Sequence, residues 1–339
     1  MSVFTSGGTE NRMRWDRTKK GFMEVWYATL NHRASGGGVW LRYTLTSPTT
    51  GPAYCELWGF FFDPDGKRSF AAKDRFPIDR LGGANGRDDG ALVRIGDAWL
   101  SENHLEGSLE RDGRSLSWSL DLEPADRCFQ HLPEQIRSRI ESRVSTLCSP
   151  NLSVPFFGSV SIDGDELTFD GELGSQSHRW GAKHSSTWSW AHCSNFDGAP
   201  DSVFEGVAAQ ASLGPIPSPT TTFLFLRYKG EDIAFNELRW ALRARSRYEM
   251  PTWSFTARNE DWKIAGAARA STDRLTQVRY EDPDGAERFC ANSEVADIAI
   301  ELYRRGEAGW RHHGSLSSLG NAHLEFGRKQ AFEEIPVAL

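Results

Sequence analysis

The stretch HRWGAKHSSTWSWAHC, residues 178–193, gathers three histidines and three tryptophans within sixteen residues. Histidine changes its protonation state near neutral pH and serves as a general acid, a general base or a metal ligand. Tryptophan brings a large apolar face, which lines ligand cavities and attracts positive charge. The stretch therefore predicts a catalytic strip, a metal site or the wall of an aromatic core.

The last seven residues of this stretch, TWSWAHC, alternate in the manner of a β-strand. Neighbouring side chains of a strand point to opposite faces, so Trp188, Trp190 and His192 share one face. If that face lines the inside of a barrel, Trp188 and Trp190 would bind an apolar substrate and His192 would be a catalytic candidate. The alternative is an ordinary packed core in which His192 bonds to the backbone.

The preceding residues, HRWGAKHSS, are rich in Gly and Ser and predict a loop at the mouth of that strand. Loops at such positions often carry function. We predict His178 and His184 as acid or base candidates, Trp180 as a wall of the substrate site, and Lys183 with Asn195 as groups that hold a polar substrate end. The alternative for each charged residue is a place on the solvated surface.

A second polar pair, Asn292 and Glu294, lies in ANSEVAD. On an alternating strand the two residues share a face, so both are predicted to project into the pocket, Glu294 as a catalytic group and Asn292 as a substrate contact. Burial beside apolar rings would disfavour the charged form of Glu294 and let it hold a proton near neutral pH. In the alternative, Glu294 is exposed or paired with an arginine.

Several other chemistries lack their sequence signal. Five and seven residues separate the three histidines, which fits no compact metal-ligand set, so no metal is predicted. The phosphate-binding and dinucleotide-binding glycine motifs are absent, so no cofactor is predicted. The G-x-S-x-G motif is absent as well, and a serine hydrolase remains only as a site assembled from distant segments.

The rest of the chain predicts an all-β protein with a short helix near the middle. Segments such as TWSFTA, WKIAGAA and LRWALRARSRY alternate between apolar and polar residues, and turn signals such as Asp163-Gly164 separate them. One segment, LPEQIRSRIESRVSTL (residues 132–147), has helical spacing and predicts an amphipathic helix. We therefore predict two antiparallel β units, residues 1–150 and 151–339.

Composition limits the partners. The 339 residues include 13 tryptophans and 20 phenylalanines and carry a net charge of −7, which favours an apolar small molecule over nucleic acid. No apolar run is long enough to span a membrane, and the first residues lack the pattern of a secretion signal, so a cytoplasmic location is expected. The five cysteines are widely spaced and are expected to be reduced thiols. The oligomeric state is left open.

Together these segments resemble a known family. FDGELG (Phe169 to Gly174), followed by HRWGAKHSSTWSWAHCSNFDG, is similar to the signature of the carotenoid 1,2-hydratase, AttH and tocopherol cyclase group, in which a W-G turn precedes a W-x-W strand and an Asn-containing end, here Asn195. CANSEVADIAIELYRR and GNAHLEFG look like the closing part of that group. GFMEVWYATLN and ELWGFFFDPDG resemble its opening strands.

The resemblance implies two lipocalin-like (calycin-type) β-barrel domains with a ligand pocket at or between them. It also implies hydration, cyclisation or pericyclic chemistry on prenylated, polyene or polyketide-derived molecules. Members with proton-driven chemistry tend to carry an acidic residue where this chain has Ser177. We therefore expect a cofactor-independent cyclase, isomerase or lyase that folds a bulky hydrophobic substrate and uses mild acid/base help. The alternative is a non-catalytic carrier of a lipophilic molecule.

Overall fold

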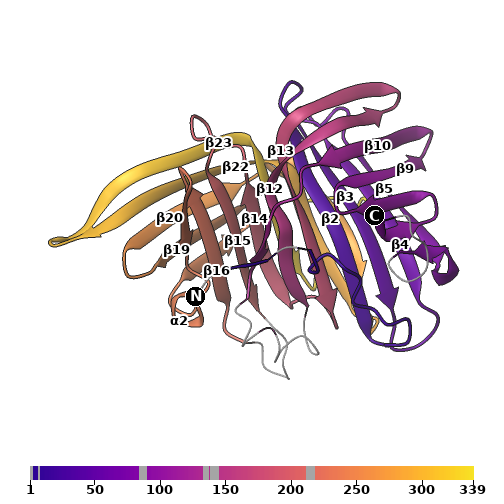
Figure 1. Cartoon of the computed structure of the whole chain (residues 1–339), viewed down its shortest axis with the longest axis horizontal. Coiled ribbons are helices and arrows are strands. Elements are labelled where there is room, and N and C mark those ends of the chain that lie inside the picture. Colours follow the sequence, from indigo (N-terminus) through magenta and orange to yellow (C-terminus); the bar gives the residue numbers. More distant parts are fainter. Residues whose placement is uncertain (1–2, 7, 84–89, 133–136, 138–144, 211–217) are drawn as a thin grey trace.

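The computed structural model describes residues 3–6, 8–83, 90–132, 137, 145–210 and 218–339. Its strands form two antiparallel sheets that lie against each other (Figure 1). The predicted all-β fold of two lipocalin-like antiparallel barrels is confirmed. None of the helices among the described residues has the length and apolar character needed to cross a bilayer.

The first sheet takes the strands up to Gly181. Its order is β5-β4-β3-β2-β13-β12-β10-β9-β8-β7-β6, with β11 joining β1 to β12. The bounds are β1 Phe4–Ser6, β2 Phe22–His32, β3 Gly37–Ser47, β4 Tyr54–Phe62, β5 Phe70–Pro77, β6 Leu81–Gly82, β7 Ala91–Ile95, β8 Ala98–Ser101, β9 His104–Arg111, β10 Arg114–Leu122, β11 Arg127–Gln130, β12 Thr146–Ile162 and β13 Asp165–Gly181, with the 3-10 turn η1 at Ile78–Arg80.

The second sheet starts after residues 182–186, which cross from one sheet to the other. Its order is β17-β16-β15-β14-β23-β22-β20-β19-β18, with β21 paired to β22. The bounds are β14 Thr187–Cys193, β15 Val203–Gln210, β16 Thr221–Tyr228, β17 Glu231–Ala234, α2 Leu238–Ala241, β18 Arg245–Glu249, β19 Thr252–Arg258, β20 Trp262–Arg269, β21 Thr276–Glu281, β22 Glu287–Gly306 and β23 Gly309–Arg328, with the 3-10 turn η2 at Thr272–Arg274.

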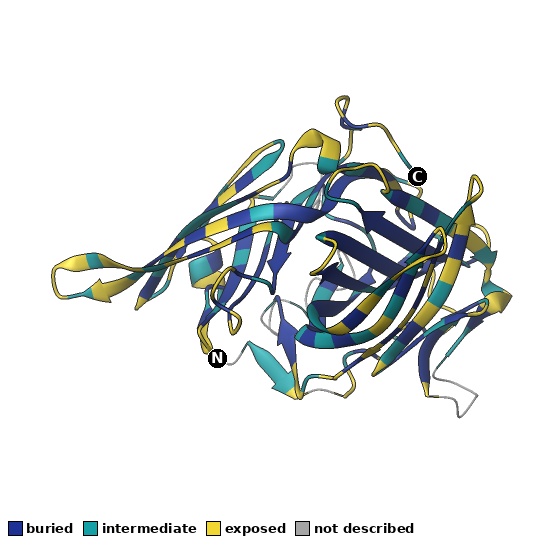
Figure 2. Cartoon of the chain, turned by 90° about the horizontal axis from the view of Figure 1, so that it is seen from above, coloured by how far each residue is buried: buried dark blue, intermediate teal, exposed yellow. Residues whose placement is uncertain are grey.

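Each sheet curls around its own apolar interior. In the first sheet, a Cβ placed on Gly59 of β4 would touch Leu109 of β9 and Leu116 of β10, so opposite walls of the barrel meet there. In the second, Phe204 of β15 stacks on Phe255 of β19 at 4.8 Å between ring centroids. Seen from above, the curled first sheet and the long β22–β23 hairpin that extends away from it are clear (Figure 2).

Burial distinguishes the strands at the junction from those at the outside. Strand β10, RSLSWSLDL, is buried at every second residue, as expected for a strand with one dry face. Strand β3 is buried at every residue because one face packs in the barrel interior and the other against the second sheet. A third apolar cluster, which includes Trp40, Trp58 and Tyr280, fills this junction between the sheets.

Three local predictions need correction or comment. Residues 178–181 belong to β13 and not to a loop, because His178 to Gly181 pair with β2 in register. LRWA, the start of the predicted strand LRWALRARSRY, is instead one turn of helix, α2. Leu, Arg and Ala favour a helix, and four residues are too few to distinguish the helical period of 3.6 from the strand period of two. Of the predicted helix at residues 132–147, residues 133–136 and 138–144 lie outside the described residues, and its end is wrong because Thr146 and Leu147 begin strand β12.

Several predicted strands and one predicted turn are present in the structure. TWSWAHC, TWSFTA and WKIAGAA form β14, β19 and β20, and Asp163-Gly164 turns β12 into β13 with positive φ at both residues. All five cysteines are buried and none is in a disulfide. The sheets change at residues 182–186, whereas the predicted domain boundary lies at residue 150, so the domain division stays a prediction.

Candidate active site

A cavity of about 320 Å³ lies between the two sheets. This volume is at the lower end of the range for small-molecule sites. The first sheet contributes Tyr27, Trp40 and Arg42, and the second contributes Trp188, Trp190 and Phe223. The cavity therefore exists only where the two sheets meet, and most of its wall is apolar.

The predicted tryptophan face of β14 forms one wall of this cavity. Trp188 and Trp190 line it, and Trp190 meets Tyr27 of the first sheet edge-on at 6.2 Å. Trp188 lies flat over Gly327 of β23, where an added Cβ would come within 2.1 Å of the indole. Glycine at residue 327 is therefore required for the position of this indole.

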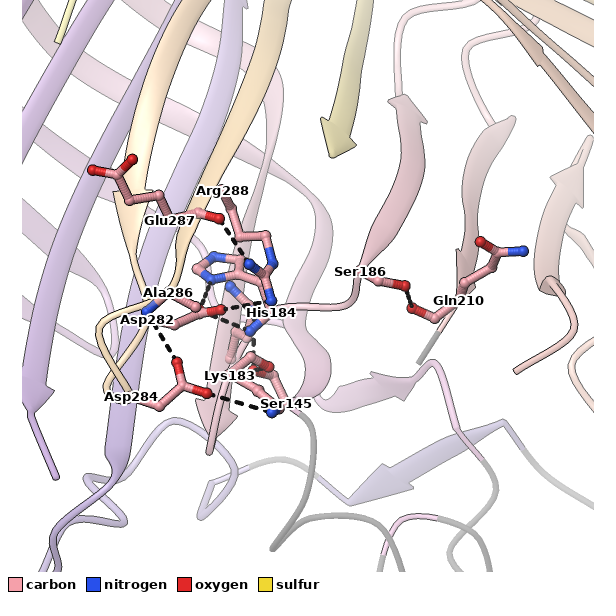
Figure 3. Close-up of polar contacts among 11 residues, drawn as sticks. Ser145, Lys183, His184, Ser186, Gln210, Asp282, Asp284, Ala286, Glu287 and Arg288 are labelled. Atoms are coloured by element: carbon pink, nitrogen blue, oxygen red, sulfur yellow. Dashed lines mark hydrogen bonds and ion pairs between the residues drawn. The ribbon is translucent and has the colours of Figure 1, made fainter. Parts of the chain in front are cut away.

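His184 lines the cavity and is held by a buried carboxylate. Its Nδ1 donates to Oδ1 of Asp282 at 2.6 Å, and its backbone N–H donates to the same oxygen at 2.9 Å. Asp282 opens the turn Asp282-Pro283-Asp284-Gly285 between β21 and β22, and Arg288 lies 3.5 Å from its other oxygen (Figure 3). Nε2 of His184 has no hydrogen-bond partner among the described residues.

The imidazole of His184 is neutral. Burial and the positive charge of Arg179 lower the pKa of His184 to about 3, and the contact with Asp282 offsets only part of this effect. Burial opposes the ionisation of Asp282, yet its bonds from His184 and the charge of Arg288 keep the pKa of Asp282 below its usual value. The contact is therefore a hydrogen bond from a neutral ring to a carboxylate, and Nε2 carries a free lone pair.

Glu325 of β23 is the acidic group of the cavity wall. Burial raises the pKa of Glu325, and the nearby arginines Arg42 and Arg179 counter part of that rise. Nε1 of Trp188 donates to Oε2 of Glu325 at 3.1 Å, while His184 stacks on the same indole at 5.4 Å. One tryptophan thus contacts both a neutral base and a carboxyl group that is inclined to keep its proton.

His192 lies one layer behind the cavity, and it is not among the residues that line it. Its Nδ1 is 2.8 Å from Oε2 of Glu205, and its Nε2 is 2.8 Å from the Ser194 hydroxyl. Glu205 also accepts hydrogen bonds from His131 at 2.7 Å and from Trp190 at 2.5 Å. These bonds outweigh burial and lower the pKa of Glu205 to about 2.

His178 and Trp180 lie within the first sheet and away from the cavity wall. Nε2 of His178 is 3.0 Å from Oε1 of Glu24, and its Nδ1 is 2.5 Å from the carbonyl of Glu10. Glu24 also accepts the backbone N–H groups of Arg14 and Trp15. This group fastens the N-terminal segment to β2 and β13, and Trp180 packs in the same barrel interior.

The remaining predicted site residues also lie outside the cavity wall. Lys183 pairs with Asp284 at 3.4 Å near the surface, and the Asn195 side chain donates to the carbonyl of Leu173. Asn292 is opposite Glu325 in the β22–β23 register. Glu294 is buried without a hydrogen bond to its carboxyl oxygens, and burial raises its pKa well above the usual value.

Sequence reasoning missed four polar groups of the site. Arg179 follows His178 in HRWG and has no distinct signal, whereas Glu325 in AHLEFG is a single acidic residue among mostly apolar neighbours. Arg42 has the same signal in VWLRYTL. Asp282 was read only as a turn residue, and its approach to His184, 98 positions earlier, is a property of the fold.

The fold places the chain among double β-barrel proteins of the lipocalin-like type, with a cavity between the two sheets. The sequence profile of the tocopherol cyclase-like family matches residues 155–328, slightly over half of the chain. This chain therefore belongs to the tocopherol cyclase-like family. An uncharacterised protein of Mycobacterium tuberculosis strain H37Rv is 29% identical over 315 residues, which cover 93% of this chain and 88% of the relative.

Solved structures share the whole fold at low identity. A protein assigned as an AttH from Nitrosomonas europaea superposes with a TM-score of 0.54 and 12% identity, covering 95% of this chain and 98% of that one. Kievitone hydratase from Nectria haematococca gives 0.54 and 11%, covering 95% and 92%. CghA gives 0.55 and 9%, covering 97% and 99%. The resemblance to the AttH and tocopherol cyclase group is thereby confirmed.

Proposed function

We propose that this protein is a cofactor-independent isomerase or cyclase that acts on a hydrophobic molecule held in the cavity between the sheets. The observation that carries the proposal is the pair formed by His184 and Asp282. A neutral imidazole that is oriented through its Nδ1–H and unbonded at its buried Nε2 can serve as a general base once a substrate contacts that nitrogen.

The second half of the chemistry needs a proton donor. Glu325 fills this role because its pKa is raised and its carboxyl group faces the same cavity. Nε2 of His184 takes a proton from one substrate carbon, and Glu325 delivers its own proton to another position. The substrate is rearranged without gain or loss of atoms, and proton exchange with water resets both residues.

The apolar wall supplies the rest of the barrier reduction. Trp188, Trp190 and Trp40 restrict a flexible substrate to one folded shape, which removes several kcal/mol of barrier in model reactions. Two structural neighbours support an enzymatic role, because kievitone hydratase and the complex of CghA with Sch210972 share this fold. A lyase reaction would use the same two residues, with Glu325 protonating a leaving hydroxyl group.

The test is an activity screen on an apolar extract of the cells that make the protein. The extract is incubated with the wild-type protein in H₂O and in D₂O and followed by mass spectrometry. An isomerase or cyclase converts one compound into a product of equal mass in H₂O, and that product contains one deuterium in D₂O. A lyase product would instead have lost the mass of water.

Variants assign the conversion to the cavity. His184→Gln and Glu325→Gln should each slow it by at least about 100-fold, whereas His312→Gln, which alters an exposed histidine bonded to Glu301, should leave it unchanged. If a compound is retained by the protein but never altered, the protein is a carrier and the catalytic proposal fails.

A further inference from the structure

We propose that the ligand of this cavity is an amphipathic carboxylate whose anionic group is held by Arg42 and Arg179. This inference rests on the proposed function, because it assigns the chemical class of the molecule that occupies the same cavity. It is carried by two arginines that line the cavity without a carboxylate partner among the residues that the structure describes.

Arg42 lies in an unusual place for a permanent charge. The residue is only 4% exposed, and its guanidinium carbon is 4.5 Å from the ring centre of Tyr280 and 5.1 Å from that of Trp58. Its Nε donates to the hydroxyl of Thr44 at 2.9 Å. Aromatic faces stabilise a cation only weakly compared with an anion, so the terminal nitrogens keep unused donor capacity.

Arg179 approaches the cavity from β13. Its terminal nitrogen donates to the Ser145 hydroxyl at 2.8 Å, which is a neutral partner. Burial, together with the repulsion of Arg42, lowers the pKa of Arg179 to about 10. Arg42 and Arg179 share one face of the first sheet, because Val25 of β2 pairs with Arg179 on one side and with Thr44, two residues after Arg42, on the other.

The acidic groups nearby are already engaged. One oxygen of Asp282 accepts both donors of His184, and Arg288 lies beside the other oxygen. Glu325 accepts the indole N–H of Trp188, and burial disfavours its ionised form. Neither Arg42 nor Arg179 forms an ion pair with a described residue of the chain.

Buried cations without a counter-charge are costly, and a bound anion removes that cost. The planar fork of a guanidinium matches the two oxygens of a carboxylate, and two forks on one cavity wall define one end of a ligand. The remaining wall is made of Trp188, Trp190, Phe223 and other apolar side chains, which suit a hydrocarbon tail. The cavity thus has one cationic end, and most of its remaining wall is apolar.

The experiment compares ligands that share a tail and differ in the head. Octanoate, octan-1-ol and octyl phosphate are titrated into the full-length protein by isothermal titration calorimetry. Octanoate should bind at least about tenfold more tightly than octan-1-ol, a difference typical of one charge-assisted contact. The preference should decrease as the salt concentration rises.

Substitution of Arg42 and Arg179 tests whether these two residues cause the preference for the carboxylate. Arg42→Met and Arg179→Met keep the apolar stem and should weaken octanoate binding about tenfold while octan-1-ol binding stays the same. The matched control is Arg279→Met, which alters an exposed arginine paired with Glu287 and should change neither affinity. The ligand series on the wild-type protein decides the matter even if a variant does not fold.

Each outcome has one meaning. Equal binding of octanoate and octan-1-ol overturns the inference and leaves the proposed function standing. Tighter binding of octyl phosphate overturns the assignment of a carboxylate. If none of the three ligands binds, the cavity is not a ligand site and both proposals fail. A carboxylate preference without any conversion in the extract screen removes the catalytic proposal alone.

Discussion

His184 and His178 stand six positions apart, and each meets a buried carboxylate. The ring of His184 bonds to Asp282 through Nδ1, its buried Nε2 has no partner among the described residues, and the residue lines the cavity. His178 uses both ring nitrogens, one toward Glu24 and one toward the carbonyl of Glu10. The difference shows that a histidine beside a carboxylate is a reactive pair only when one nitrogen stays unbonded at a surface that a substrate reaches.

The largest expected effect separates these two histidines. His184→Gln removes the general base and should lower kcat/KM by about 10²–10⁴-fold, and it should also lower the melting temperature because Asp282 loses a buried partner. His178→Gln should retain turnover and lower the melting temperature, because Glu24 loses a buried partner. Kinetic assays on the converted compound and thermal melts of both variants measure this contrast. Equal kinetic losses in both variants would remove the distinction.

A second contrast concerns His131 and His192, which both bond to the buried carboxylate of Glu205 and stabilise the fold. Glu205 has a pKa of about 2 in the folded protein against an ordinary value of 4.5, so its ionised form stabilises the fold above pH 4.5. That stabilisation, about 3 kcal/mol, is lost as the pH falls from 4.5 toward 2. Urea unfolding at pH 6 and pH 3 should show a smaller pH effect in Glu205→Gln than in the wild-type protein. Identical pH effects in the two proteins would contradict the assignment.

A smaller effect is expected where the cavity wall is shaped by packing. Gly327→Ala would place a methyl group against the indole of Trp188, so the variant should lose about 1–3 kcal/mol of stability and bind octan-1-ol less well. Adding Trp188→Leu should recover part of the stability, because the smaller side chain leaves room. Ala substitution without any loss would show that the indole moves freely.

The smallest effect is expected at the surface. Lys183 and Asp284 form a partly exposed ion pair at 3.4 Å, and such pairs contribute at most about 1 kcal/mol. Lys183→Ala should therefore change neither turnover nor octanoate affinity by more than a small factor. A large loss of affinity would restore Lys183 as the group that holds the polar substrate end.

The sequence predicts the fold better than it predicts the site. Alternation in TWSWAHC correctly puts Trp188 and Trp190 on one face, because strand geometry is local and has a period of two. The same alternation also places His192 on that face, but it cannot show that Glu205 and the Trp190 ring lie between His192 and the cavity. How deep a residue sits depends on strands far away in the sequence.

Asp282 and Glu325 illustrate the other limit. Glu325 is a single acidic residue among mostly apolar neighbours, whereas Asp282 stands in the acidic turn Glu281-Asp282-Pro283-Asp284, and the spacing of both residues to His184 contains no motif. They meet His184 and Trp188 only after β21, β22 and β23 have paired and the second sheet has docked on the first. A lone charge among mostly apolar strand residues points to Arg42 and Glu325, whereas Arg179, which follows His178 in a stretch rich in Ser and Gly, has no such signal.

The turn that carries Asp282 is joined to the first sheet by a hydrogen bond from the N–H of Thr49 to the carbonyl of Pro283, at 2.8 Å. His184 itself stands on the short segment that runs from β13 to β14. A small slide of one barrel along the other would thus pull apart the aspartate, the histidine and the aromatic wall together. Expressed separately, each half of the chain would carry some of these residues but no working centre.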